Sequence, residues 1–135
     1  MKLILDTNIW ISFLLGKSLS ILTEIFKRND IEIYVSEQLI KEIKEVAHRS
    51  KIAKLISSNS FENLLDLINV RCKMISSDAE GEFDIRDTKD IYILRMAKNV
   101  LADYIITGDK DLLVLKNFQV TKIITFTEFK ELYFN

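Results

Sequence analysis

KLILDTN, residues 2–8, places three polar side chains directly after a short apolar run. The run Lys2–Leu5 predicts a strand, and its consecutive apolar residues are typical of a strand buried on both faces of a sheet. Asp6 then stands where this strand ends. Ligands of open parallel sheets bind beyond the carboxyl ends of the strands, so the segment predicts a central strand with a functional position at its end.

The same order, an apolar run and then a stretch with helical spacing, recurs along the chain. The further expected strands are Ile31–Val35, Val70–Ile75, Tyr104–Thr107 and Ile123–Phe126. The expected helices lie within Ser18–Lys27, Glu37–Ile56, Phe61–Ile68, Thr88–Val100 and Glu128–Tyr133. This alternation predicts a single α/β domain over residues 1–135, with a central parallel sheet of about five strands flanked by helices.

Composition and charge indicate one globular domain and exclude one class of nucleic-acid-binding protein. The chain has 135 residues, of which 48% are hydrophobic, enough for one buried core. Its 19 Lys and Arg residues nearly balance 20 Asp and Glu residues, giving a formal net charge of -1. This balance excludes the broad positive field of a nonspecific nucleic-acid coat, so any nucleic-acid contact needs a local patch or metal ions.

The rare residue types limit the possible catalytic chemistry and the cellular compartment of the protein. A single cysteine, Cys72, excludes an intramolecular disulfide, and a single histidine, His48, excludes a Ser-His-Asp triad and His-rich metal centres. Polar residues from Asp6 onward interrupt the N-terminal apolar run, which is too short for a secretory or membrane-spanning segment. We therefore expect a soluble, cytoplasmic protein that makes no membrane contact.

Asp109 repeats the arrangement of Asp6. It follows the apolar run Tyr104–Thr107, and Gly108 just before it favours a tight turn at the strand end. Each acid on its own also has an ordinary explanation, because a carboxylate after a strand often caps the next turn. Asp111 is ambiguous in the same way: it adds charge to a site, or it only caps.

Two further acids come from expected helices. Asp90 falls within the apolar arc of Thr88–Val100, where a charged side chain is unusual and its presence has to be explained. A first-turn carboxylate stabilises a helix start, but Asp87 already suits that capping position. We therefore expect Asp90 to point into a shared polar pocket. Asp87 either adds negative charge to that pocket or only caps the helix. Glu42 borders the apolar stripe of Glu37–Ile56, a position that in isolation indicates a solvated helix flank.

Taken together, the four acids can reach one crevice at the carboxyl edge of the sheet. Several carboxylates about 4–6 Å apart cannot all stay ionised unless a positive charge lies among them. Oxygen ligands without His or Cys favour Mg²⁺ or Mn²⁺. Such an ion polarises a phosphate, lowers the pKa of a bound water and stabilises the leaving oxygen. The pattern therefore predicts metal-assisted phosphodiester cleavage.

Four segments of the chain, in this order, resemble the PIN-domain nucleases: LILDTNIW (3–10), SEQLIKEI (36–43), RDTKDIYILRMA (86–97) and YIITGDKDLL (104–113). The likeness extends over essentially the whole chain. It is greatest to the small single-domain toxin components of toxin–antitoxin pairs. The resemblance implies a PIN-like three-layer sandwich in which a central parallel sheet lies between layers of helices.

The resemblance also implies an activity and its residues. The four catalytic acids of the family fall on Asp6, Glu42, Asp90 and Asp109. They imply endonuclease cleavage of RNA that depends on Mg²⁺ or Mn²⁺ and leaves a 5′-phosphate and a 3′-hydroxyl. Asp6, Asp90 and Asp109 are implied as direct or water-mediated metal ligands, and Glu42 as a ligand or a water-orienting group.

Supporting residues and partners follow from the same resemblance. Asn8 and Thr107 are expected to make polar contacts at the strand ends. An antitoxin protein and a second copy of the chain, forming a homodimer, are the implied protein partners. The expected RNA contacts are four lysines, although lysines are equally typical of an ordinary protein surface: Lys17, Lys41, Lys110 and Lys116.

Other functions fit parts of the pattern. A receiver-like phospho-acceptor signalling domain has a strand-end Asp, but it should carry a second acid where this chain has Thr7 and a Lys where it has Thr125. A phosphatase with an Asp nucleophile should carry a second Asp where this chain has Asn8. A PIN fold that binds RNA or a protein without cutting it is the third alternative, although four retained acids favour an active site.

Overall fold

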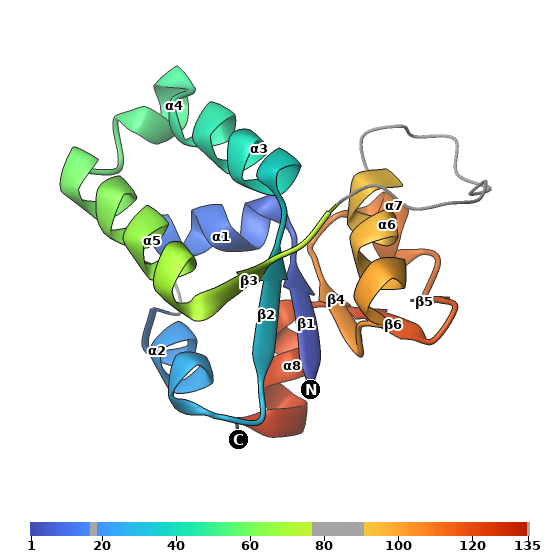
Figure 1. The fold of residues 1–135 in the computed structure, drawn as a ribbon. Coiled ribbons are helices and arrows are strands. Elements are labelled where there is room, and N and C mark those ends of the chain that lie inside the picture. The colour runs from blue at the N-terminus through green and yellow to red at the C-terminus, as the bar shows by residue number, and fades with distance from the viewer. Residues whose placement is uncertain (17–18, 77–90, 135) are drawn as a thin grey trace.

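A central sheet with helices on both faces makes up the computed structural model, which describes residues 1–16, 19–76 and 91–134 (Figure 1). The sheet has the strand order β3-β2-β1-β4-β6-β5. All neighbouring strands pair in parallel except β5, which is antiparallel to β6. The strands are β1 Lys2–Leu5, β2 Glu32–Val35, β3 Cys72–Met74, β4 Tyr104–Ile106, β5 Asn117–Phe118 and β6 Thr121–Ile124.

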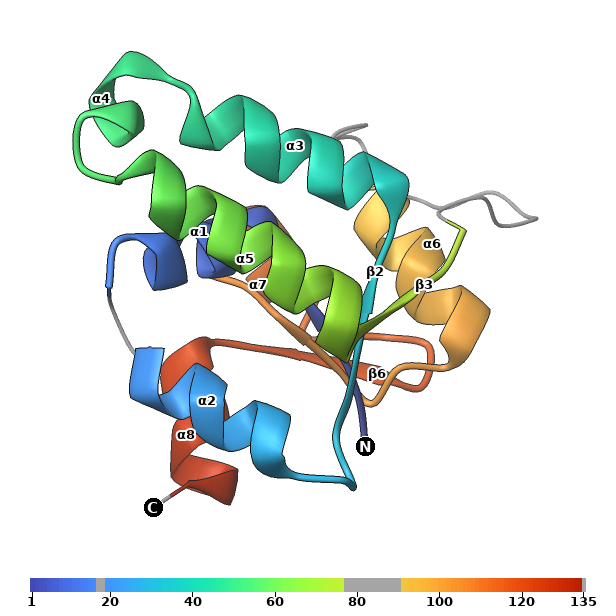
Figure 2. The same cartoon turned by 60° about the vertical axis from the view of Figure 1, so that its left-hand side comes forward.

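Helices cover the sheet as a three-layer α/β sandwich. They are α1 Thr7–Leu14, α2 Leu19–Lys27, α3 Glu37–Ala47, α4 Ser50–Ala53, α5 Ser58–Arg71, α6 Ile91–Val100, α7 Lys110–Leu113 and α8 Phe126–Tyr133. Helices α1, α2, α5 and α8 lie on one face, and α6 lies on the other face against β1 and β4 (Figures 1 and 2). This is the architecture expected from the alternation of apolar runs and helical spacing.

Strand β1 lies at the point where the chain changes direction across the sheet. Leu3 pairs with Ile33 of β2 on one side and with Tyr104 of β4 on the other. The chain first builds β2 and β3 outward from one edge of β1 and then crosses to build β4 on the other edge. A crevice for ligands forms beyond the carboxyl ends of the strands at such a reversal, and Asp6 and Asp109 follow the two strands that border it.

The strand order also separates this fold from that of a receiver domain. In the receiver-type sheet, one strand lies outside the first strand. Here two strands, β2 and β3, lie outside β1. The topology therefore removes the fold-level basis for the phospho-acceptor alternative.

Several elements differ from the sequence prediction. Helix α1 follows β1 directly and was not expected, because its run of apolar residues has no clear polar face. The short helix α7 and the two-residue strand β5 were also missed, and β5 makes the sheet six-stranded where about five strands were expected. Helices α5 and α8 begin before their predicted starts.

The segment predicted as one helix over Glu37–Ile56 is broken in two. Helix α3 ends at Ala47, and the exposed His48 ring nitrogen Nδ1 lies 2.7 Å from the Lys44 carbonyl oxygen, close to the last turn. Arg49 then takes an extended conformation before α4. No Gly or Pro marks this break, so residue type alone does not predict it.

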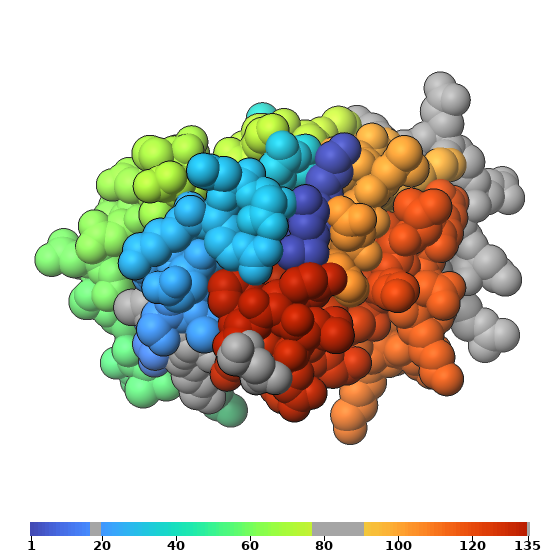
Figure 3. Space-filling view, turned by 90° about the horizontal axis from the view of Figure 1, so that it is seen from below, coloured from blue at the N-terminus to red at the C-terminus, as the bar shows by residue number. Residues whose placement is uncertain are grey.

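Helix α8 joins the core on the face shared with α1 and α2. Figure 3 shows it lying beside α2. Phe129 is fully buried, with its ring centroid 6.2 Å from that of Tyr104, and Phe126 meets the Phe13 ring edge to face. A capping box made by Thr125 and Glu128 begins the helix.

Replacing the buried Phe129 by Ala should lower the free energy of unfolding by about 3–5 kcal/mol, because it removes an aromatic ring from the core. Leu132→Ala, in the same helix at an exposed position, should change it by less than about 0.5 kcal/mol. Urea denaturation followed by circular dichroism measures both values. Equal losses in the two variants would contradict the packing of α8 into the core.

Candidate active site

Polar side chains follow four neighbouring strands at the carboxyl edge of the sheet. Asp6 follows β1, Ser36 follows β2, Thr107 follows β4 and Thr125 follows β6. Asp6, Ser36 and Thr107 are buried. Buried polar groups need hydrogen-bond partners, and each of the three has them, so the edge is an ordered polar layer above the apolar core.

Asp6 accepts hydrogen bonds at both carboxylate oxygens. Its Oδ1 accepts from the backbone N–H of Thr7 at 2.7 Å, which makes Asp6 the N-cap of α1. Its Oδ2 accepts from the Thr107 hydroxyl at 2.7 Å. Asp6 therefore caps α1 through one oxygen, while its other oxygen faces the neighbouring strand end, an arrangement compatible with the predicted site.

Thr107 connects Asp6 to Asp109. Its hydroxyl donates to Asp6 and accepts from the backbone N–H of Asp109 at 2.9 Å. Asp109 is half-buried and is itself the N-cap of α7, where its Oδ1 accepts from the backbone N–H of Asp111 at 2.9 Å. The prediction that Thr107 supports the strand-end acids is consistent with these two contacts.

Glu42 is connected to Asp6 from the other side. The Tyr92 hydroxyl of α6 donates to Oε2 of Glu42, and the Thr7 hydroxyl lies 3.4 Å from the same Tyr92 oxygen. Thr7 is adjacent to Asp6 and shares its buried position. Hydrogen bonds thus run from Glu42 through Tyr92, Thr7, Asp6 and Thr107 to Asp109.

Burial and neighbouring charges shift the ionisation of Asp6. Removal from water raises the pKa of Asp6 above its ordinary 3.8, and the hydrogen bonds from Thr107 and Thr7 act in the opposite direction. The negative charges of Glu42 and Asp109 raise the pKa further. This mutual repulsion places the three carboxylates in one electrostatic environment.

The donor chemistry of this environment fits Mg²⁺ or Mn²⁺. Asp6, Glu42 and Asp109 offer only carboxylate oxygens, which these hard cations prefer, and a cation would relieve the repulsion at Asp6. Within residues 1–16, 19–76 and 91–134, no three or more Asp, Glu, His or Cys residues are grouped so that they could hold a metal ion. The predicted residues Asp90 and Asp87 lie in 77–90, outside the described residues.

The remaining predicted residues lie on the surface. Asn8, in the first turn of α1, is exposed, as is Asp111 in the first turn of α7. Asp111 contributes its backbone N–H to Asp109, which accounts for a capping-turn position. Of the four lysines predicted to contact RNA, Lys41, Lys110 and Lys116 are exposed, while Lys17 lies outside the described residues.

Sequence reasoning missed two members of the hydrogen-bonded group, Thr7 and Tyr92. Tyr92 belongs to the buried side of α6, and by its spacing it is indistinguishable from a core aromatic residue. Thr7 was noticed only as a polar neighbour of Asp6. The signal for both residues lies in their hydroxyl groups at buried positions, since a buried hydroxyl needs a partner.

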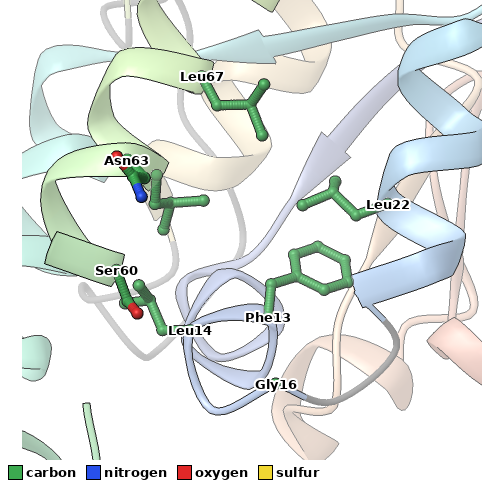
Figure 4. A pocket seen from close by; sticks show the side chains of 8 residues that line it. Phe13, Leu14, Gly16, Leu22, Ser60, Asn63 and Leu67 are labelled. Carbon is green, nitrogen blue, oxygen red and sulfur yellow. The ribbon is translucent and has the colours of Figure 1, made fainter. Parts of the chain in front are cut away.

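An apolar pocket of about 260 Å³ lies away from these acids, between the end of α1, α2 and α5 (Figure 4). Leu14, Ser60 and Leu67 are among the side chains that line it, and none of its lining residues carries a charge. It therefore offers no group for hydrolysis.

In the part of the chain that the structure describes, every helix is too short or too polar to cross a membrane.

Comparisons with known proteins give a family and a fold. A family model described as a PIN domain matches residues 2–111. Among solved structures, this chain is similar to a chain in the crystal structure of VapBC2 from Rickettsia felis, which is bound to a DNA fragment from the promoter of those proteins. The TM-score is 0.58 and the sequence identity is 18%. The alignment covers 91% of this chain and 98% of that one. At this identity the likeness concerns the fold. The search of curated proteins gave no match.

The raised pKa of Asp6 predicts how stability depends on pH. Because the folded pKa lies above the ordinary 3.8, the folded state holds this proton more tightly than the unfolded state. Between these two pKa values, the stability of the metal-free wild type relative to Asp6→Asn should therefore fall as pH rises, and it should be level above the folded pKa.

Urea unfolding of both proteins at intervals from about pH 3 to pH 7, in EDTA, measures this difference. The Asp66→Asn variant, altered at an exposed position of α5, is the matched control and should follow the wild type throughout. A wild type that gains stability over Asp6→Asn with rising pH would contradict the raised pKa.

Proposed function

The chain belongs to the PIN-domain family, and we propose that it is a metal-dependent endoribonuclease acting as the toxin of a toxin–antitoxin pair. The observation that carries this proposal is the hydrogen-bonded group at the carboxyl edge of the sheet, which consists of Asp6, Thr7, Glu42, Tyr92, Thr107 and Asp109. PIN domains of this kind are generally nucleases. The buried carboxylate of Asp6, with the half-buried Glu42 and Asp109 repelling it, supports hydrolysis of a phosphodiester more than binding alone.

Each acid has a place in the proposed reaction. Asp6 and Asp109, with Asp90 from the segment outside the described residues, hold Mg²⁺ or Mn²⁺, and Glu42 serves as a ligand or orients a water. The bound ion supplies polarisation of the phosphate and a water of lowered pKa. Thr107 keeps the Asp6 and Asp109 ends of the site in register through its two hydrogen bonds.

RNA is the substrate that we propose, and lysines outside the acidic centre contact its backbone. Lys41 comes one residue before Glu42, and Lys110 one residue after Asp109, and both side chains are exposed. Cations so placed attract phosphates toward a centre that is itself negative. Asn8, exposed in the first turn of α1, adds a neutral polar group beside Asp6.

The proposed protein partners are an antitoxin and a second copy of this chain. The similarity in fold to a chain of a VapBC2 complex supports the antitoxin. The homodimer follows from the family resemblance. An antitoxin bound near the carboxyl edge would keep the nuclease silent, and in this setting the protein acts in the cytoplasm.

Purified protein incubated with mixed structured and unstructured RNA should cleave it in Mg²⁺ or Mn²⁺, and EDTA should abolish the cleavage. Asp6→Asn, Asp90→Asn and Asp109→Asn should each lower the rate by at least about 100-fold, because each removes a charge that holds the ion. Asp66→Asn, at an exposed position on α5, should keep the wild-type rate. Gel analysis of labelled RNA gives the rates.

The opposite results are equally informative about the site. Cleavage that survives Asp6→Asn and Asp109→Asn would move the active centre elsewhere. RNA binding without turnover, by folded protein in both metals, would favour a PIN fold that binds RNA without cutting it.

Toxicity is tested in growing bacteria. Induced expression of the wild type without an antitoxin should arrest growth within a few generations, whereas Asp6→Asn should allow growth at the rate of an empty control, since a toxin of this kind acts through its cleavage. Asp66→Asn should arrest growth like the wild type. Normal growth with abundant, active wild-type enzyme would contradict the toxin assignment and leave the nuclease assignment standing.

A further inference from the structure

Tyr92 contacts three parts of the molecule at the candidate active site. It belongs to α6, donates its hydroxyl hydrogen to Glu42 of α3, and lies 3.4 Å from the hydroxyl of Thr7 at the start of α1. We propose that Tyr92 is a positioning residue that fixes the Glu42 carboxylate beside Asp6 for the reaction. This inference rests on the proposed nuclease function and deepens it.

The direction of each hydrogen bond follows from the number of hydrogens available. Tyr92 has one hydroxyl hydrogen, and a carboxylate can only accept, so that hydrogen goes to Glu42. The Thr7 hydroxyl must then donate to the Tyr92 oxygen. Thr7 and Tyr92 thus act in series, and the carboxylate of Glu42 is tied to the same backbone turn that carries Asp6.

Burial makes this contact rigid. Tyr92 is 4% exposed and Thr7 is 2% exposed, so neither hydroxyl can exchange its partner for water without opening the site. A tyrosine hydroxyl, with its ordinary pKa of about 10, is protonated at neutral pH and can donate.

Glu42 needs such support because α3 alone does not place it. Its helix packs through Leu39 and Ile43 on the buried side, and Glu42 lies at the border of that side, half-buried. A glutamate side chain at a border position has several rotamers available. The Tyr92 hydrogen bond selects one arrangement and occupies one carboxylate oxygen, Oε2, which leaves the other for a cation or a water.

A buried phenylalanine would fill the same space in the core, so Tyr92→Phe removes only the hydroxyl. The chain offers a matched control in Tyr34 of β2, which is also buried and donates to Oε2 of a glutamate, Glu32, at 2.7 Å. Tyr34→Phe removes the same kind of bond from a position outside the candidate site. Any effect confined to Tyr92→Phe therefore reports on Glu42.

The experiment compares wild type, Tyr92→Phe, Tyr34→Phe, Glu42→Ala and the double variant Tyr92→Phe/Glu42→Ala. Calorimetric titration with Mn²⁺ gives metal affinity without reference to turnover, and RNA cleavage gives kcat and KM. Tyr92→Phe should weaken Mn²⁺ binding and lower kcat by about 10- to 100-fold, as expected for a hydrogen bond to a charged group. The KM for RNA and the thermal midpoint should stay near those of Tyr34→Phe.

The double variant shows whether Tyr92 acts through Glu42. In the Glu42→Ala background the further substitution of Tyr92 should change Mn²⁺ affinity by less than about 2-fold, because the acceptor is already gone. Full multiplication of the two single effects would overturn the proposal, as would a Tyr92→Phe variant that matches Tyr34→Phe in affinity and kcat.

The failure of this inference is distinguishable from failure of the proposed function. Cleavage by the wild type with no selective effect of Tyr92→Phe overturns the positioning role and leaves the nuclease intact. Selective loss of Mn²⁺ affinity in Tyr92→Phe without cleavage of any RNA overturns the nuclease and leaves the positioning role. A folded wild type that binds no Mn²⁺ overturns both.

Discussion

The buried carboxylate of Asp6 is the constraint on which the site depends. It stands at the end of the central strand β1, where it must be withdrawn from water, and it is held there by the backbone N–H of Thr7 and the hydroxyl of Thr107. A buried charge is costly unless it is hydrogen-bonded and compensated. The fold supplies the hydrogen bonds from two different elements, while the nearby Glu42 and Asp109 add repulsion in place of compensation. A divalent cation held among these carboxylates would offset the repulsion.

The same hydrogen bonds that satisfy Asp6 also order its surroundings. Thr107 ends β4 and Thr7 begins α1, so the two contacts join the adjacent strand and the following helix to the end of β1. The parallel pairing of β1 with β4 sets their ends side by side, and the backbone N–H of Asp6 donates to the Ile106 carbonyl at 3.0 Å as a last rung of that pairing. The cap of α1 and the proposed site therefore share one carboxylate, so neither explanation of a strand-end acid excludes the other.

Much of the fold was predictable because its signals are local. The apolar run Lys2–Leu5 is β1 to the residue, and the buried residues of α3 include Leu39 and Ile43 of its predicted stripe. The elements that were missed are those whose local signals are weak. Helix α1 is apolar on too many sides to show a helical period, and no Gly or Pro marks the break after α3.

The strand-end positions of Asp6 and Asp109 and their oxygen-only donor chemistry are predictable from the sequence alone, because strand periodicity and residue type are properties of neighbours along the chain. Which groups meet depends on how distant elements pack. The contacts of Tyr92 with Glu42 and Thr7 join residues 50 and 85 positions apart. They exist because α6 packs against β1 and β4 and reaches α3 at the carboxyl edge. A tyrosine on an apolar stripe has the same local sequence pattern whether or not its hydroxyl makes a hydrogen bond. Only the packing of distant elements distinguishes these two cases.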